Sequence, residues 1–282
     1  MTSDLPYEPE LQAALDAVES ARPAILDAYA AFEPIPDAAA SISLPIDRQT
    51  QDVLLRHLAA RFPDDAFCAE EETPALAGLA GPGSGRPRMW IIDPIDGTRG
   101  FAMKNGEFSV MVGLVDQGQV AVGVVLEPVR GRLTYATRGG CCWRRDGEAP
   151  AERCHVSTTD RLPGATLTVS RSSTGRRRSR HVEALGDVRL LAAYSAGLKL
   201  AHVARGEADL YLNVYPNFND WDICAGQVLV EEAGGKVCGL TGQEISYGHG
   251  RNQQRDGLLA TNGRIHEAAL QALRQAGGNP TA

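Results

Sequence analysis

The sequence predicts an α/β protein, because segments with the apolar spacing of helices alternate with segments that have the apolar–polar alternation of strands. Residues 11–32 carry apolar side chains at helical spacing, with Pro23 as a point where the helix could kink, and Pro34 and Pro36 end it. A second helix is expected over residues 52–61. From residue 89 onward the pattern changes to that of strands, so a sheet is expected to follow the two helices.

The later segments continue this alternation. Residues 108–128 are expected to form a β-hairpin that turns at Asp116, Gln117 and Gly118. The segment 73–88, rich in glycine and proline, is expected to be a loop, and so is the basic run 175–180. The other expected elements are strands at 89–93, 131–140 and 166–173, a helix at 196–205, a strand at 208–214, a helix at 223–233, a strand at 257–262 and a helix at 265–275.

Composition excludes several classes of protein. The 282 residues are 43% hydrophobic and 22% charged, which is ordinary for a globular protein and excludes disorder as the main state. The net charge of −7 and the pI of about 5.4 argue against binding to a nucleic acid polymer. No secretory signal and no transmembrane segment is recognised, and the six cysteines form no C-x-x-C pair. We therefore expect a reduced, cytoplasmic protein, with peripheral association with a membrane left open.

Acidic residues concentrate in three short segments. Glu70, Glu71 and Glu72 follow an apolar stretch, Asp93 and Asp96 flank Pro94, and Asp220 and Asp222 flank a tryptophan. Four apolar residues precede Asp93, so its carboxylate is expected at the end of a buried strand, where it needs a partner, a proton or a metal ion. Oxygen ligands suit hard cations, above all Mg²⁺, and the six histidines show no zinc-binding spacing. The sequence therefore predicts a magnesium site.

The residues that follow Asp96 favour phosphate chemistry. Gly97 and Thr98 offer free backbone N–H groups where a turn or helix begins, which is a suitable seat for a phosphate group. Metal ligands beside such a seat imply hydrolysis of a phosphate ester. The chain has no G-x-S-x-G motif and no cysteine beside an obvious histidine partner, so the attacking group is expected to be a water activated by metal.

These motifs, in this order, resemble those of the Mg²⁺-dependent, lithium-sensitive phosphatases of the inositol monophosphatase superfamily. The resemblance rests on Glu70-Glu71, on the run from Asp93 to Thr98, and on Trp221-Asp222 with Ala225-Gly226, and it extends over about residues 47–262. It implies an αβαβα sandwich with two halves. Residues 1–150 would form an N-terminal α/β half carrying most metal ligands, and residues 151–282 a C-terminal half that contributes Asp222 and substrate contacts. The active site would lie between them.

The resemblance also implies roles for individual residues. Two or three Mg²⁺ ions would be held in each site by Glu70, Asp93, the Ile95 carbonyl, Asp96 and Asp222. Asp47 and the Thr98 hydroxyl would orient the attacking water, with Glu71 behind them, although the Val-Thr that usually precedes the Asp47 position is absent. The expected substrate contacts are Glu70, Ile95, Asp96, Gly97, Thr98, Lys199 and Asp222. A two-metal in-line displacement is the implied mechanism.

Within the superfamily the chain looks most like the CysQ-type 3′(2′),5′-bisphosphate nucleotidases, through segments 104–110, 168–172 and 206–211 and through Gly197-Leu198-Lys199. This likeness implies hydrolysis of 3′-phosphoadenosine 5′-phosphate to AMP, with Lys199 either at the second phosphate or an ordinary surface lysine. Ser173, Ala196 and Asn213 replace polar residues of that branch. An inositol phosphate or another small sugar phosphate therefore stays an alternative substrate, a catalytically silent binding protein stays an alternative function, and a homodimer stays open.

Overall fold

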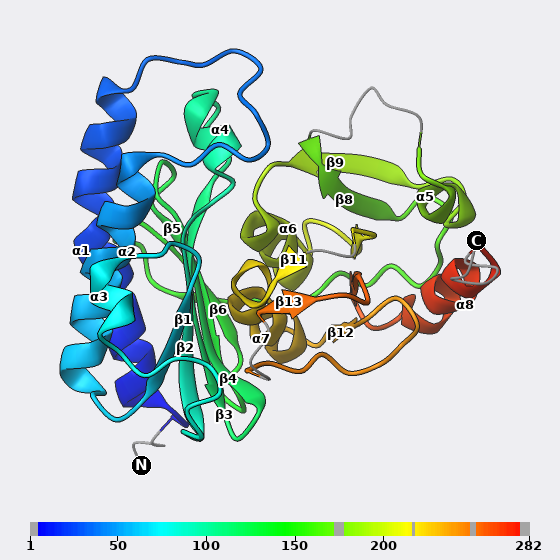
Figure 1. The fold of residues 1–282 in the computed structure, drawn as a ribbon. Coiled ribbons are helices and arrows are strands. Elements are labelled where there is room, and N and C mark those ends of the chain that lie inside the picture. Colours follow the sequence, from blue (N-terminus) through cyan, green and yellow to red (C-terminus); the bar gives the residue numbers. More distant parts are fainter. Residues whose placement is uncertain (1–4, 172–177, 216–217, 249–251, 277–282) are drawn as a thin grey trace.

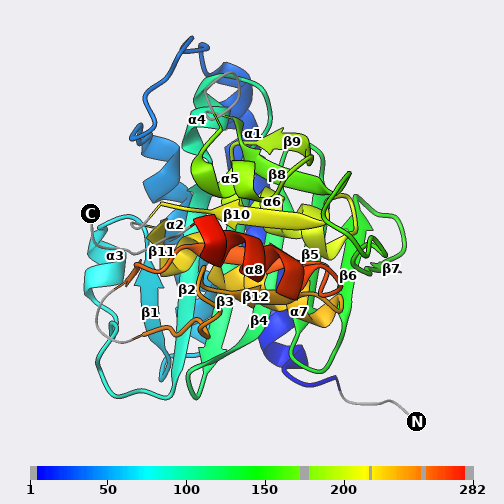
Figure 2. The same cartoon turned by 90° about the vertical axis from the view of Figure 1, so that its right-hand side faces the viewer.

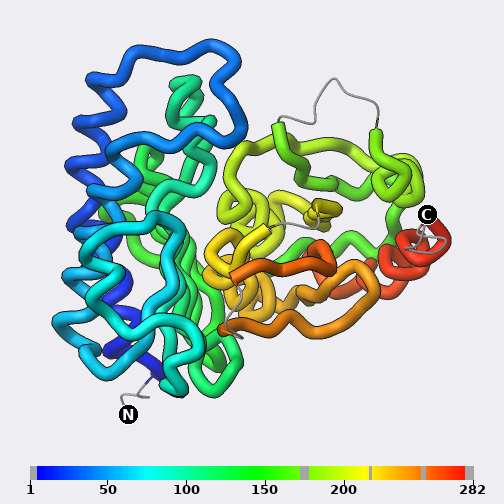
Figure 3. Tube along the Cα trace, viewed as in Figure 1, coloured from blue at the N-terminus to red at the C-terminus, as the bar shows by residue number. Residues whose placement is uncertain are grey.

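The computed structural model describes residues 5–171, 178–215, 218–248 and 252–276, and these form five stacked layers (Figure 1). Helices α1 and α2 cover one face of a seven-stranded sheet. Helices α6 and α7 cover its other face and separate it from a five-stranded sheet, which α5 and α8 cover on the far side. The expected α/β fold with an αβαβα layer order is confirmed. Figure 3 traces the chain from the helices at the left, through the sheets, to α8 at the right.

The helices differ in length and in position. Their bounds are α1 Glu8–Ala31, α2 Pro45–Arg61, α3 Pro74–Ala77, α4 Thr98–Ala102, α5 Arg180–Ala184, α6 Ala196–Ala204, α7 Cys224–Glu232 and α8 His266–Ala276, with a 3₁₀ turn at Asp220–Asp222. Seen from the side, α8 lies in front of the five-stranded sheet (Figure 2). Among the described residues, no helix has both the length and the apolar character that crossing a bilayer would need.

The first sheet has its strands in chain order. They are β1 Ala66–Ala69, β2 Arg88–Asp96, β3 Ser109–Asp116, β4 Gln119–Glu127, β5 Arg132–Thr137, β6 Cys142–Asp146 and β7 Glu152–Arg153. Only β1 and β2 are parallel to each other, and the other neighbours are antiparallel. The hairpin expected at residues 108–128 is the pair β3–β4, with its turn at the predicted residues.

The second sheet mixes parallel and antiparallel pairs in the order β12-β14-β10-β8-β9. Its strands are β8 Thr166–Ser170, β9 Arg189–Ala193, β10 Leu210–Asn213, β12 Lys236–Cys238 and β14 Leu258–Thr261, and a separate small pair joins β11 Phe218–Asn219 to β13 Gln253–Gln254. The expected division of the chain near residue 150 falls between β6 and β7, within the first sheet, and it stays a prediction.

Several expectations about the elements were wrong. The second helix begins at Pro45 rather than at Asp52, and the backbone N–H of Leu44 donates to the Asp47 carboxylate at 2.7 Å, which caps its first turn. Pro23 lies inside α1 without splitting it. The segment 73–88 contains the short helix α3 and the first residue of β2.

Close packing of α7 on the first sheet depends on a glycine. A Cβ atom at Gly123 of β4 would lie 2.2 Å from the carbonyl oxygen of Ala225, so only glycine allows this approach. The 3₁₀ turn that carries Asp222 immediately precedes α7 and contacts β2 and β3. The packing of α7 therefore brings Asp222 to the end of β2.

Candidate active site

Two carboxylates lie side by side because β1 and β2 are parallel and end at the same edge of the sheet. Glu70 directly follows β1, and its backbone N–H donates to the carbonyl oxygen of Ile92 at 3.3 Å. Asp93 lies on β2 and is 2% exposed, and the Glu70 charge helps to raise its pKa. Two carboxylates at the same edge of a sheet repel each other when both are charged, and a proton or a cation between them relieves this repulsion.

Asp96 joins the first sheet to the helix layer behind it. The pairing of β2 with β3 shifts register between Asp93 and Asp96, and this irregularity turns the end of the strand toward α6. The Ser195 hydroxyl donates to Oδ2 of Asp96 at 2.5 Å, and the Gly197 N–H donates to the same oxygen at 2.6 Å. Asp96 is thereby fixed at the N-terminus of α6, where the helix dipole favours a negative charge.

Asp222 completes a cluster of acids. One carboxylate oxygen from each of Asp93, Asp96 and Asp222 lies within 4.8 Å of the others. Burial, together with the surrounding carboxylates, raises the pKa of Glu70 to about 8 and that of Asp222 to about 7. Burial and the same neighbours hold the pKa of Asp93 well above its usual range.

The cluster has the chemistry of a site for a hard cation. Oδ1 of Asp93 is buried and has no hydrogen-bond partner among the described residues, which is costly unless a cation or proton occupies that position. All side-chain donors are carboxylate oxygens, the ligands that Mg²⁺ prefers. The residues present therefore fit the magnesium expected from the sequence.

The residues expected to act on water lie around this cluster. The Thr98 hydroxyl donates to the carbonyl oxygen of Ile95 at 3.0 Å. Asp47 is 2% exposed, and its Oδ1 is buried without a partner among the described residues. Burial, and to a lesser extent the Glu71 charge, raise the pKa of Asp47 to about 7 despite the bond from Leu44.

Glu71 is held in place from two sides. Its carboxylate accepts hydrogen bonds from Ser43 and Arg48, each at 3.1 Å. The Gln51 side-chain amide accepts from the Glu71 backbone N–H at 2.8 Å and donates to the Glu71 carbonyl at 2.5 Å. The first turns of α2 thus position both Asp47 and Glu71.

Gly97 has a backbone requirement. Its φ is +84°, in the region that favours glycine, and a Cβ atom there would lie 3.0 Å from the Glu107 carbonyl oxygen and 3.1 Å from the Ser195 nitrogen. The turn between Asp96 and Thr98 therefore packs directly against α6. The role of Gly97 and Thr98 as a phosphate seat stays a prediction.

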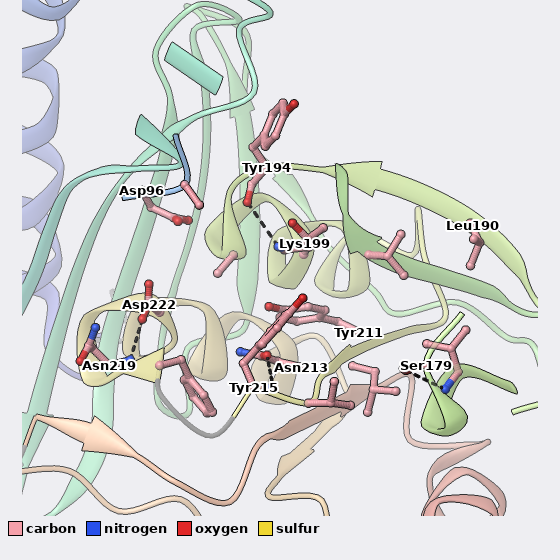
Figure 4. Close-up of a pocket in the computed structure, with 18 of the residues that line it drawn as sticks. Asp96, Ser179, Leu190, Tyr194, Lys199, Tyr211, Asn213, Tyr215, Asn219 and Asp222 are labelled. Atoms are coloured by element: carbon pink, nitrogen blue, oxygen red, sulfur yellow. Dashed lines mark hydrogen bonds between the residues drawn. The ribbon is translucent and has the colours of Figure 1, made fainter. Parts of the chain in front are cut away.

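Two adjoining cavities open over the acid cluster. The smaller, of about 330 Å³, is lined by the predicted residues Glu70, Glu71, Asp93, Ile95, Asp96, Gly97, Thr98 and Asp222. The larger, of about 780 Å³, shares Asp96, Asp222 and Tyr194 with it and extends over Lys199 and Tyr211 (Figure 4). All the predicted site residues except Asp47 thus line one or both cavities.

Lys199 is buried, so the alternative that it is an ordinary surface lysine is wrong. It is 5% exposed, its ammonium donates to the Tyr194 carbonyl at 3.3 Å, and it lies 5.1 Å from the centre of the Tyr211 ring. Figure 4 shows it between these two residues, with Asp96 and Asp222 on its left and Leu190 and Ser179 on its right. Burial lowers the pKa of Lys199, while the Asp96 and Asp222 charges oppose this shift.

Sequence reasoning missed several residues of the site. Ser195 and Tyr194 belong to none of the quoted motifs, since only the packing of α6 brings them to the acid cluster and to the larger cavity. Tyr211 ends the segment 206–211 that carried the nucleotidase likeness, and it lines the larger cavity. Ala196 and Asn213, which replace polar residues of the nucleotidase branch, both line the larger cavity. Ser173 and residues 175–177 of the basic run lie outside the described residues.

Comparisons with known proteins agree with this geometry. A family model described as the inositol monophosphatase family matches residues 10–277. The fructose-1,6-bisphosphatase/inositol-1-monophosphatase of Thermotoga maritima is 30% identical over 236 residues, which cover 82% of this chain and 81% of that protein. The 3′(2′),5′-bisphosphate nucleotidase CysQ of Salmonella typhimurium is 30% identical over 240 residues, covering 84% and 93%. The solved structure of a Thermotoga maritima IMPase superposes with a TM-score of 0.77 at 26% identity, covering 95% of this chain and 98% of that one.

Proposed function

Because the chain belongs to the inositol monophosphatase family of metal-dependent phosphatases, we propose that it removes the 3′-phosphate of 3′-phosphoadenosine 5′-phosphate, giving AMP and inorganic phosphate. The observation that carries this proposal is the buried Lys199 ammonium in the larger cavity. The ammonium donates its hydrogen bond to a neutral carbonyl, so it can still donate to an anionic group of the substrate.

The magnesium would be held by the carboxylates of Glu70, Asp93, Asp96 and Asp222 and by the Ile95 carbonyl. When bound, Mg²⁺ supplies positive charge at the phosphoryl oxygens and lowers the pKa of water. The protein would contribute a proton acceptor and an orienting hydroxyl. Oδ1 of Asp47 is buried and without a described partner, so it is available to take a proton, and Thr98 offers its hydroxyl next to Ile95.

The shape of the site supports a substrate with two parts. The scissile phosphate would lie in the small acidic cavity, and the leaving group would extend into the larger one, where Tyr211 and Tyr215 contribute aromatic surface. Tyr215 is 59% exposed, so its ring is free to pack against a base. A nucleoside with a second phosphate matches this combination of aromatic surface and buried cation.

The alternative substrate is an inositol phosphate or another small sugar phosphate. The replaced positions Ala196 and Asn213 favour it, because both line the larger cavity and neither carries a charge for a second phosphate. The Thermotoga relative named above, at the same identity as the nucleotidase, supports it equally.

Phosphate release decides between these substrates. The protein is supplied with Mg²⁺ and either 3′-phosphoadenosine 5′-phosphate or inositol 1-phosphate, each with and without Li⁺, and Asp93→Asn serves as the blank. We expect kcat/KM for the nucleotide to exceed that for the inositol ester at least about tenfold, which corresponds to one charge-assisted contact. The reverse preference would replace the proposal with the alternative. Release from neither substrate, with Mg²⁺ binding intact, would favour a catalytically silent protein.

A further inference from the structure

Two cysteines face each other across neighbouring strands, far from the acid cluster in the chain. In the β6–β7 pair, Trp143 is opposite Arg153, so Cys142 is opposite Cys154 one step further along. The Cys154 N–H donates to the Cys142 carbonyl at 2.8 Å, which continues the ladder to this pair. Residues opposite each other in an antiparallel pair have Cα atoms about 4.5–5.5 Å apart, within the range that a disulfide spans.

Residues opposite each other in an antiparallel pair carry their side chains on the same face of the sheet, so both thiols point to the same side of the β6–β7 pair. Cys142 is fully buried and Cys154 is 6% exposed, and both belong to the core between the first sheet and helices α6 and α7. A disulfide would therefore form within the existing backbone, with little movement of either strand.

The surroundings differ for the two sulfurs. The neighbouring Cys142 thiol lowers the pKa of Cys154, burial opposes this, and the Arg205 and Arg144 charges lower it. The neighbouring Cys154 thiol and burial raise the pKa of Cys142 well above its usual range. The Arg205 guanidinium is itself buried at the end of α6, where it donates to Glu127 at 2.9 Å. A cysteine near cations, with a second thiol opposite it on the neighbouring strand, has the arrangement of a reactive dithiol.

We propose that Cys142 and Cys154 form a peroxide-reactive site that closes to an intramolecular disulfide. The Cys154 thiolate attacks one oxygen of hydrogen peroxide, the O–O bond breaks, and hydroxide leaves and takes up a proton to give water. The resulting sulfenic acid is attacked by the Cys142 thiol, which forms the S–S bond and releases a second water. The two thiols are oxidised by two electrons and hydrogen peroxide is reduced to two waters. This site does not depend on which phosphate ester the protein hydrolyses.

The other cysteines provide internal controls. Cys141 precedes Cys142 but has a φ of +66° and directly follows the Gly139–Gly140 turn, and it is more exposed than either member of the pair. Burial raises the pKa of Cys68 to about 12, and burial also raises the pKa of Cys224. If exposure alone governed oxidation, Cys141 would react first.

The test is peptide mapping of the whole protein after a short exposure to hydrogen peroxide, followed by alkylation and trypsin digestion without reductant. Cleavage after Arg138, Arg144 and Arg153 separates Cys142 from Cys154. We expect one linked pair, residues 139–144 with 154–161, that loses two hydrogens relative to the free peptides and disappears after treatment with dithiothreitol. Alkylated Cys154 in the treated protein, or sulfinic acid at Cys154 without the link, would overturn the proposal.

Variants identify the sulfurs. Cys141→Ala should leave the linked pair intact, whereas Cys142→Ala and Cys154→Ala should each abolish it. Persistence of the link in Cys142→Ala would assign it to Cys141 and overturn the proposal. If Cys142→Ala or Cys154→Ala fails to fold, the peptide maps of the wild type and of Cys141→Ala still test the proposal. A link that persists in Cys141→Ala can join only Cys142 and Cys154, because these are then the only cysteines in the two linked peptides.

Discussion

The hydroxyl of Ser195 makes two hydrogen bonds that hold α6 against the acid cluster. It donates to Oδ2 of Asp96 at 2.5 Å and accepts from the backbone N–H of Leu198 at 2.9 Å, as the N-cap of α6. One side chain thus satisfies a helix terminus and a buried carboxylate. Because Lys199 lies on the first turns of the same helix, Ser195 also sets where that cation stands relative to Asp96.

Ser195→Ala should therefore affect both stability and metal binding. We expect the free energy of unfolding to fall by about 1–3 kcal/mol, from the lost cap and the lost partner of a buried carboxylate. Thermal unfolding with and without Mg²⁺ measures it, and the concentration of Mg²⁺ needed for half of the stabilisation should rise. Ser179→Ala, which removes the N-cap of α5 and its bond from Val182, is the matched control. If Ser195→Ala and Ser179→Ala needed the same concentration of Mg²⁺ for half of the stabilisation, Ser195 would have no effect on metal binding, and the prediction would be wrong.

Asp93→Asn should abolish phosphate release. The amide keeps the size of the side chain but removes the charge at Oδ1, which is buried without a partner among the described residues. Loss of several kcal/mol of transition-state stabilisation corresponds to at least about 10²-fold in kcat/KM. The upward shift in melting temperature on adding Mg²⁺ should vanish as well. Glu72→Gln, an exposed acid in the same segment as Glu70, should retain both properties. More than a few per cent of wild-type turnover in Asp93→Asn would exclude it as a ligand.

Lys199→Gln should change substrate preference rather than the chemical step. Removing the ammonium from the larger cavity should raise KM for 3′-phosphoadenosine 5′-phosphate about tenfold, the equivalent of one charge-assisted hydrogen bond, and should leave KM for inositol 1-phosphate within about twofold. Steady-state kinetics with both substrates measure this. Lys236→Gln, at a lysine whose side chain is 59% exposed, is the control. Equal losses with both substrates would mean that Lys199 contacts the scissile phosphate or holds α6 in place.

Sequence patterns predicted the acids of β2 better than the rest of the site. Asp93 and Asp96 flank Pro94 in one short run, so their proximity follows from local geometry, and a buried strand before them is visible in the apolar residues. Asp222 was assigned through the family resemblance, because no periodicity relates it to β2. Ser195 and the burial of Lys199 were missed, since they depend on how α6 packs across the sheet.

Helix α2 illustrates a limit of the patterns. Its second half has apolar residues at helical spacing and was expected, but Arg48, Gln49 and Thr50 interrupt that spacing in the first turns. Leu44 at the N-cap position is not a capping residue, so the usual start signal is absent. The Asp47 carboxylate supplies the cap from inside the helix, a contact that appears only once the backbone is folded.

His202 predicts how stability depends on pH. It lies on α6, is 7% exposed, and its Nδ1 has no partner among the described residues. Burial, and then the Arg205 charge, lower its pKa to about 4, although Glu207 at 3.7 Å opposes the shift. The unfolded chain binds a proton near pH 6.5 and the folded chain does not, so the contribution of His202 is present above pH 6.5 and is lost as the pH falls from 6.5 toward 4.

A pKa of His202 lowered from 6.5 to about 4 corresponds to at most about 3 kcal/mol of stability over that range. Urea unfolding at several values between pH 4.5 and 7.5, with Mg²⁺ held constant, should show the free energy of unfolding of the wild type falling more steeply toward low pH than that of His202→Gln. His57→Gln, at an exposed histidine of α2, should follow the wild type and so exclude a general effect of removing an imidazole. If the free energy of unfolding of the wild type and of His202→Gln depended on pH in the same way, His202 would be protonated equally in the folded and unfolded states. The prediction that its imidazole is buried and neutral would then be wrong.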